Sequence, residues 1–497
     1  MSKQDTMPNN IECLLVEAKN ASAIERPGAL LALVEILCDE DPFTVAMYAE
    51  QVKAIGLCTK TEFMDAIRDA KKQNGKYEGK SIQQAKPTDD ELAIRWLSEN
   101  SLTSFGLGEF RRYKDGVWPE LAQDTAKKEV SSVLEKAKPE GIRPTKSRLE
   151  SVLEIARVKI SVPNDMWDNQ IDYLPCKNGV LHIPARTLKP HSPDYHFTTS
   201  LDYGYDPEAD CPNFKYVLET TIPEETLFLQ EFIGYALTTD TRYEIAVWLY
   251  GPPGSGKSTI LTGLQAMLGE RAGLLGLADI ERSRFALTNL PGKTLVTATE
   301  QPAMNMSATH ILNAIISGEP ISVDRKYRDP IIVFPFAKVI WAMNELPNIK
   351  QANNGLFRRV KVVRFPPLHE SAKDITLKEL VKTEGPGILN WALDGLERLR
   401  AREQFELPPS IMVATDDFQS ENDVPAQFVS ECCVTGSDFK VQASTFYKAY
   451  KDWCTITGNA PLSSTKIAGH WKRLSFNNYE ANGRRWWRGV GLREDRG

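Results

Sequence analysis

A glycine-rich loop with a lysine and a hydroxyl residue interrupts the stretch VWLYGPPGSGKSTILTGL, residues 247–264. Gly251, Gly256, Lys257 and Ser258 match G-x-x-x-x-G-K-[ST] at every fixed position. Glycines let backbone N–H groups approach phosphate oxygens, the lysine reaches the β- and γ-phosphates, and the serine hydroxyl can bind Mg²⁺. The sequence therefore predicts a nucleoside triphosphate site. The residues expected to contact the nucleotide are Gly251, Pro252, Pro253, Gly254, Ser255, Gly256, Lys257, Ser258 and Thr259.

The flanking patterns are those of a buried parallel strand at 244–250 and a helix that ends before Gly269. A phosphate loop also needs a carboxylate, normally at the end of a neighbouring strand. Glu300 follows such a strand pattern, and Asn344 follows another, with an amide able to orient a water against the γ-phosphate.

Two clusters of basic residues are further candidates for functional contacts. Arg358 and Arg359 precede a further strand pattern. A positive charge beside the γ-phosphate is worth about 10³ to 10⁵ in rate and is often supplied by a neighbouring subunit. Between two apolar strand patterns lie four basic or aromatic residues, Arg325, Lys326, Tyr327 and Arg328. They suit contacts with nucleic-acid phosphates and stacking on bases, and the alternative is a solvated edge whose charges block aggregation.

The last 32 residues are basic although the whole chain has a net charge of −6. TKIAGHWKRL reads as a basic helix, and YEANGRRWWRGVGL as a hairpin that turns at Asn482-Gly483. Such a unit suits duplex DNA, and three arginines of the hairpin are candidate contacts: Arg484, Arg485 and Arg488. We expect one of Trp486 and Trp487 to be buried.

The amino-acid composition indicates the general class of protein. The chain has 497 residues, 42% hydrophobic and 25% charged, which is typical of a soluble globular protein with three or four domains. No apolar run approaches the roughly 20 residues of a membrane span, and the start lacks the apolar core of a signal peptide. Eight cysteines without a C-x-x-C pair indicate free thiols, and we expect a cytoplasmic protein.

The patterns along the chain predict a small helical module at 1–75, a polar linker at 76–91 and an α+β domain at 92–235. The α+β domain contains hairpin patterns at Lys114-Asp115-Gly116 and Asn178-Gly179. The nucleotide domain is expected at 236–400, and a compact C-terminal unit at 425–497.

Residues 297–366, from TATEQPAMN to KVVRFP, resemble the superfamily 3 helicase core, and the resemblance extends over about 100–497. More narrowly, they are similar to the helicase half of phage, satellite and plasmid primase–helicases, a family that includes the poxvirus primase–helicase. The resemblance implies an AAA+-like parallel sheet with helices on both faces, preceded by an α+β domain and followed by a winged helix.

By this resemblance, 251–259 is the Walker A loop, Glu300 the Walker B acid and general base, and Asn344 the sensor of the γ-phosphate. Ser258 and Glu300 would hold Mg²⁺, and Arg358 or Arg359 would be the arginine finger. Residues 317–330 would form a hairpin in the channel of a ring, with Arg325, Lys326 and Arg328 toward DNA. Two departures are Thr299, where many members have a second acid, and Asn313, where a lysine is usual.

The implied function is an ATP-dependent replicative DNA helicase of a phage or mobile element, acting as a hexameric ring on single-stranded DNA. Two alternatives remain open: an origin-binding initiator that melts duplex DNA locally, and a nucleotide-switched module that assembles replication proteins. The residues before about 92 are too few for a primase domain, so a separate primase is the expected partner. No membrane is expected as a partner.

Overall fold

The structure is a computed structural model, and its described residues form two compact units, 1–86 and 87–497. The residues that it describes are 7–21, 26–74, 86–301, 305–306, 309–326, 328–349, 354–367 and 376–493. Within them, no helix combines the length and the apolar composition needed to cross a membrane.

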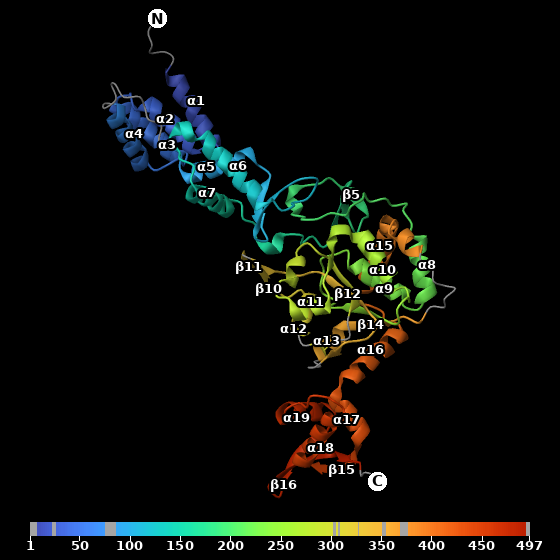
Figure 1. The fold of residues 1–497 in the computed structure, drawn as a ribbon. Coiled ribbons are helices and arrows are strands. Elements are labelled where there is room, and N and C mark those ends of the chain that lie inside the picture. The colour runs from blue at the N-terminus through green and yellow to red at the C-terminus, as the bar shows by residue number, and fades with distance from the viewer. Residues whose placement is uncertain are drawn as a thin grey trace. The chain divides into compact units, whose positions relative to one another are not determined.

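The described residues of the first unit form four helices (Figure 1): α1 Met7–Asn20, α2 Arg26–Leu37, α3 Pro42–Ala54 and α4 Lys60–Asn74. Their apolar faces meet in a core that includes Leu33, Tyr48 and Phe63. Asp41 starts α3, because its carboxylate accepts hydrogen bonds from the first free N–H groups of that helix.

The second unit begins with α5 Asp89–Glu99, β1 Thr103–Gly106, β2 Glu109–Arg112, α6 Gln123–Lys136 and α7 Lys146–Lys159. Thr88 and Glu91 form a capping box, so α5 starts inside the segment predicted as a linker. The hairpin predicted around Asp115 is present as a short bridge in which Lys114 and Val117 exchange backbone hydrogen bonds. A three-stranded antiparallel sheet follows, of β3 Tyr173–Cys176, β4 Gly179–His182 and β5 Thr187–Lys189.

The turn between β3 and β4 differs from the prediction by one residue. Cys176 pairs with Gly179, so Lys177 and Asn178 form the turn, and the predicted Asn178-Gly179 turn is wrong. The side-chain amide of Asn178 donates to the carbonyl oxygen of Tyr205 at 2.9 Å and accepts from its N–H at 2.8 Å. This distant contact fixes Asn178 and, with it, the register.

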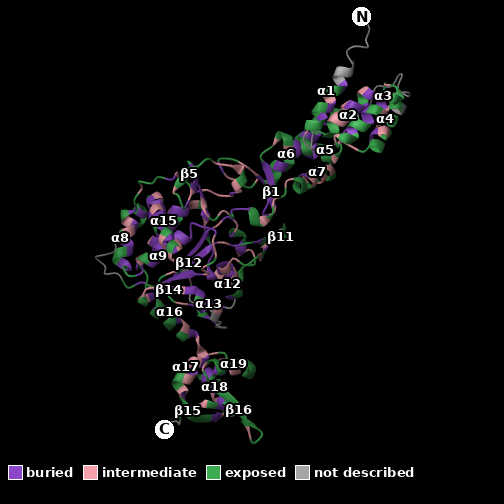
Figure 2. Cartoon of the chain, turned by 180° about the vertical axis from the view of Figure 1, so that it is seen from behind, coloured by how far each residue is buried: buried purple, intermediate pink, exposed green. Residues whose placement is uncertain are grey.

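A five-stranded parallel sheet forms the centre of the second unit, in the order β14-β6-β12-β8-β7. Its strands are β6 Ala246–Tyr250, β7 Ala272–Leu274, β8 Leu295–Gln301, β12 Lys338–Met343 and β14 Val360–Arg364. Side chains alternate between the faces, so Val247 and Leu249 join one core while Ala246 and Trp248 join the other. Figure 2 shows β12, the central strand, buried. The predicted α/β class, with helices on both faces of a parallel sheet, is confirmed.

Helices cover both faces of this sheet. On one face lie α8 Pro212–Thr221, α9 Thr226–Tyr235, α10 Lys257–Leu268, α14 Leu377–Val381 and α15 Gly385–Arg402. On the other lie α11 Leu277–Arg282, α12 Thr309–Ser317, α13 Asn354–Arg359 and α16 Pro409–Asn422. Although the sequence places α8 and α9 in the 92–235 domain, they pack in the same core as β6 and α10.

Two separate strand pairs contribute residues to this core. The antiparallel pair is β10 Ile321–Arg325 with β11 Arg328–Val333, and the parallel pair is β9 Asn305–Met306 with β13 Asn348–Ile349. The chain then forms α17 Val424–Cys432, β15 Cys433–Gln442, α18 Ala443–Ile456, α19 Ser464–Arg473, β16 Asn477–Ala481 and β17 Arg484–Leu492. The hairpin predicted at Asn482-Gly483 is confirmed, with both residues at positive φ. Trp487 is buried and Trp486 half-buried, as expected for an alternating strand.

Candidate nucleotide site and basic hairpin

The glycine-rich loop joins the end of β6 to the start of α10. A Cβ on Gly251 would lie 2.4 Å from the carbonyl oxygen of Phe365, and Gly251 has a φ of +157°. Gly256, at a φ of +92°, precedes the first turn of α10. Only glycine meets both demands, close backbone approach and left-handed geometry. The loop is therefore held in a shape that exposes backbone N–H groups at a helix N-terminus, as phosphate binding requires.

Lys257 folds back over this loop. Its ammonium donates to the carbonyl oxygens of Gly251 at 2.6 Å and Pro252 at 2.8 Å, and to the hydroxyl of Ser255 at 3.1 Å. The side chain is buried, and burial lowers the pKa of Lys257. Its three donors are thus held within the loop, on oxygen atoms that phosphate oxygens can replace. Ser258 is exposed at the first turn of α10, where its hydroxyl is a hard oxygen ligand suited to Mg²⁺.

The ends of three strands align beside the loop. Met343 of β12 pairs with Tyr250 of β6 and with Gln301 of β8. The backbone of Glu300 and that of Asn344 therefore lie at the same carboxyl edge as the phosphate loop. Asn344 is exposed there, and the side chain of Glu300 lies outside the described residues.

Arg358 and Arg359 lie at the opposite edge of the sheet. β14 runs parallel to β6 with Val360 beside Ala246, so the residues just before Val360 lie at the amino ends of the strands. The five residues of β6 separate this edge from the phosphate loop by roughly 16 Å, at about 3.3 Å per residue. The chain does not bring these arginines to its own phosphate loop.

Both arginines contact one carboxylate, that of Glu244. Arg358 reaches it at 3.4 Å, and Arg359 forms a closer ion pair with the same oxygen. Arg359 also donates to the carbonyl oxygen of Gly355 at 2.9 Å. The two differ in burial, since the Arg358 side chain is 67% exposed and that of Arg359 is 11% exposed.

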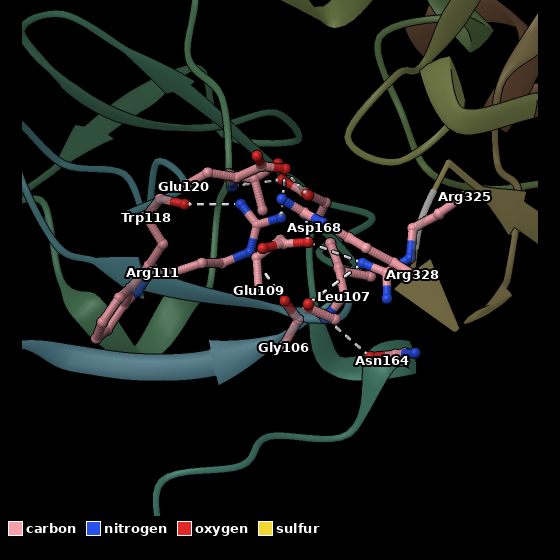
Figure 3. Close-up of polar contacts among 12 residues, drawn as sticks. Gly106, Leu107, Glu109, Arg111, Trp118, Glu120, Asn164, Asp168, Arg325 and Arg328 are labelled. Carbon is pink, nitrogen blue, oxygen red and sulfur yellow. Dashed lines mark hydrogen bonds and ion pairs between the residues drawn. The ribbon is translucent and has the colours of Figure 1, made fainter. Parts of the chain in front are cut away.

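The basic cluster flanks the turn of the β10–β11 hairpin. Arg325 pairs with Arg328 across the hairpin, Lys326 is exposed at the turn, and Tyr327 lies outside the described residues. Figure 3 shows both arginines directed toward Glu109 of β2. Arg325 ion-pairs with the Glu109 carboxylate at 2.8 Å, and Arg328 contacts the same oxygen.

A hollow of about 440 Å³ beside this hairpin includes two residues that the sequence analysis did not select, Arg284 and Phe285. The Arg284 guanidinium lies 4.8 Å from the ring centroid of Phe285. Lys326 lines the same hollow. The signal was a basic residue next to an aromatic one in the polar stretch ERSRF, which is typical of single-strand contacts.

The basic residues near the C-terminus divide between a helix and a strand. Arg484, Arg485 and Arg488 of β17 are exposed, and the Arg488 guanidinium lies 5.1 Å from the ring centroid of Tyr479. The last turn of α19 adds Lys472 and Arg473, which are both exposed. Each of the three predicted arginines therefore faces solvent.

A parallel sheet with a glycine-rich loop at its carboxyl edge is the arrangement of a P-loop nucleotide-binding protein. Three protein families match this chain: D5 N terminal like at 93–223, a family of unknown function at 249–359, and Poxvirus D5 protein-like at 420–476. These matches confirm the predicted resemblance to the D5-like primase–helicases of phages and poxviruses.

Similar proteins include "Putative helicase L207/L206" of Acanthamoeba polyphaga mimivirus, 22% identical over 57% of this chain and 33% of that protein. Another is "Putative helicase 022R" of Frog virus 3, 28% identical over 27% of this chain and 15% of that protein. The chain thus spans a third or less of these relatives. Among solved structures, the apo C-terminal region of NrS-1 is 13% identical with a TM-score of 0.48, covering 82% of this chain and 100% of that one.

Proposed function

We propose that this chain is an ATP-dependent DNA helicase that works as a homo-hexameric ring. The ring would translocate on single-stranded DNA and open duplex DNA during replication of a phage or mobile element. The matches to the D5-like families and the names of the two viral relatives support a helicase-related role in replication. Host-cell cytoplasm is the corresponding location.

The observation that carries this proposal is the placement of the phosphate loop and the arginines at opposite edges of one sheet. Arg358 is exposed, and it lies about the length of β6 away from a nucleotide on the loop of its own chain. Such a site is completed when the arginine edge of one subunit meets the loop edge of the next. Head-to-tail contacts of this kind close into rings. The strand order, with β6 between β14 and β12, supports an AAA+-like core.

Within the ATP site, Lys257 would leave the carbonyl oxygens of its loop for the β- and γ-phosphates. Glu300 would accept a proton from the attacking water, and Asn344 would orient that water from the neighbouring strand end. The Ser258 hydroxyl and Glu300 would hold Mg²⁺, which would supply positive charge to neutralise the phosphates. Because Thr299 is not acidic, Glu300 would have to serve both as the carboxylate ligand of Mg²⁺ and as the proton acceptor.

The unequal burial of the two arginines assigns them different roles. Arg359 is anchored by Glu244 and Gly355, so we assign it to holding α13 against the sheet. Among the described residues, the Arg358 guanidinium contacts Glu244 alone, at 3.4 Å, and its side chain is largely exposed, which suits a finger that enters a neighbouring site. Arg358 is therefore the proposed arginine finger.

For DNA, we assign the channel contact to the β10–β11 hairpin, with Lys326 at its turn and Arg284 and Phe285 in the adjoining hollow. The C-terminal unit, residues 425–497, would be a winged helix that contacts duplex DNA through Arg484, Arg485 and Arg488. The remaining layout would be a helical module at 1–75, a pre-helicase domain at 92–235 and the ATPase from 236 to 400. A separate primase would be a partner.

The test is steady-state ATP hydrolysis with and without single-stranded DNA. Wild type should be strongly stimulated by DNA, Lys326→Ala should bind ATP yet lose the stimulation, and Lys257→Ala should not hydrolyse ATP. Equal rates with and without DNA in the wild type would exclude a translocating motor and favour the nucleotide-switched module.

An origin-binding initiator is the second candidate, favoured by the exposed arginines of β17. An initiator should bind one duplex sequence at least about 10³-fold more tightly than unrelated duplexes at physiological salt. A helicase that uses this unit only to hold duplex DNA should show little preference. Binding of a duplex library, sequenced after selection, separates the two.

A further inference from the structure

The β10–β11 hairpin is anchored to the pre-helicase domain through Glu109 of β2. Alternation along β2 places Glu109 and Arg111 on the same buried face. The Glu109 side chain is 7% exposed, and one of its oxygens receives both hairpin arginines, Arg325 and Arg328 (Figure 3). A carboxylate this deeply buried requires such partners, because an unpaired buried charge is strongly destabilising.

Arg325 makes further hydrogen bonds at this contact through its guanidinium. It donates to the carbonyl oxygen of Gly108 at 3.2 Å and to that of Asp329 at 3.0 Å. A Cβ on Gly108 would lie 2.4 Å from the Arg325 guanidinium, and Gly108 has a φ of +78°. The turn between β1 and β2 is therefore shaped to receive this arginine, whose side chain is only 16% exposed.

A second contact ties the other strand of the hairpin to the same turn. The Asn164 amide donates to the carbonyl oxygen of Ile332 in β11 at 3.1 Å. Its oxygen accepts from the N–H of Leu107, in the β1–β2 turn, at 2.9 Å. Two strands of the hairpin are thus fixed by a carboxylate and an amide, while Lys326 at the turn is exposed.

We propose that Glu109 is a positioning residue that holds the DNA-contacting hairpin, through Arg325 and Arg328, so that Lys326 meets the DNA backbone. The proposal rests on the proposed function and divides the basic cluster into two roles. Arg325 and Arg328 anchor the hairpin, and Lys326 contacts phosphate. The pre-helicase domain then determines where the hairpin tip lies.

The test uses Glu109→Gln in the full-length chain, because glutamine keeps the size of the side chain and removes its charge. Two quantities are measured: hydrogen exchange of the amides in 321–333 without DNA, and the concentration of single-stranded DNA that gives half-maximal ATPase stimulation. We expect faster exchange and a half-maximal concentration about tenfold higher, since small misplacements of a positioned group reduce rates by an order of magnitude or more.

The sign of the DNA effect is decisive. Removal of a negative charge next to a phosphate site should by itself tighten DNA binding. Tighter DNA binding by Glu109→Gln would overturn the positioning role of Glu109. It would show instead that Glu109 competes with DNA for the arginines. Unchanged exchange and unchanged DNA dependence would overturn the proposal as well.

Glu120→Gln is the matched control. Glu109 and Glu120 line one hollow of about 530 Å³, but the Glu120 side chain is 65% exposed and its carboxylate lies 3.7 Å from Arg111. It should behave like the wild type in both measurements.

The variant that combines Glu109→Gln with Arg328→Gln should lose little more DNA stimulation than either single variant, as expected for residues that act as one unit. Fully additive losses would contradict that. If the wild type shows no DNA stimulation, the proposed function fails, whereas hydrogen exchange still tests the anchoring of the hairpin.

Discussion

Arg359 and Glu244 form an ion pair at the amino edge of the central sheet, two residues before β6 begins. The same strand ends at the phosphate loop. The two ends of β6 therefore lead to the phosphate loop and to Glu244, the residue that holds the arginines. Glu244 has a φ of +45°, an uncommon value for a non-glycine residue, and its carboxylate serves both Arg358 and Arg359. A shift of β6 on nucleotide binding would therefore move the arginine edge directly.

The division of roles between the two arginines is testable by paired substitutions. Arg358→Ala should reduce ATP hydrolysis by about 10³-fold or more with little change in thermal stability, as for other arginine fingers. Arg359→Ala should lower the unfolding temperature, because it leaves Glu244 and the Gly355 carbonyl oxygen without that partner.

Mixing experiments test whether Arg358 acts in a neighbouring subunit. Lys257→Ala and Arg358→Ala chains are each expected to be inactive. In a mixture, an intact loop of one chain can meet an intact Arg358 of the other, so part of the activity should return. A mixture without activity, formed from chains that still assemble, would show that Arg358 does not complete the site of a neighbouring chain.

Local patterns were sufficient to predict the strand–loop–helix around Lys257 and the hairpin at Asn482-Gly483, because neighbouring residues determine both. The β3–β4 turn was misplaced since Asn178 is held by Tyr205, far along the chain. The same limit applies to the Glu109–Arg325 contact, which joins residues 216 positions apart. Residue types predicted a basic hairpin but not which of its arginines is the less exposed.

Gly251 should be intolerant of any side chain. Gly251→Ala places a Cβ 2.4 Å from the Phe365 carbonyl oxygen at a left-handed φ, so the loop must shift away from β14. We expect ATP binding to weaken at least about tenfold and stability to fall by roughly 1 to 3 kcal/mol. Isothermal titration and thermal unfolding measure both.

The control is Gly469→Ala on α19, where a Cβ meets nothing within 4 Å. Because alanine favours a helix over glycine, this variant should be as stable as the wild type or more stable by up to about 1 kcal/mol. Normal ATP binding by Gly251→Ala would show that the loop adapts without losing its shape.

Burial of Lys338 should make the stability of the protein depend on pH. It starts β12 and is buried, with its ammonium 2.6 Å from the Thr238 carbonyl oxygen and 4.3 Å from the ring centroid of Tyr235. Burial lowers the pKa of Lys338 from 10.5 to about 7. Between these values the unfolded chain binds one more proton than the folded chain, so stability rises with pH in this window, by at most about 1.4 kcal/mol per unit.

Below pH 7 the unfavourable effect of burying this charge is present in full. Lys338→Met should therefore remove part of the rise in the free energy of unfolding between pH 7 and 9, measured by urea titration. Lys378→Met, at an exposed position of α14, is the control and should keep the rise. A Lys338→Met variant with the wild-type pH dependence would show that Lys338 keeps its proton in the folded state.

The arginines of β17 should determine how binding of duplex DNA depends on salt. Arg484, Arg485 and Arg488 are exposed on one short strand, and each phosphate contact releases about one counterion. Each substitution by alanine should therefore lower the slope of log Kd against log salt by about 1, for all sequences alike. Fluorescence anisotropy with a labelled duplex measures this slope, and Lys448→Ala, exposed on α18, is the matched control. If Lys448→Ala changes the slope as much as Arg488→Ala, the charge of the C-terminal unit acts as a whole and β17 is not its DNA-binding edge.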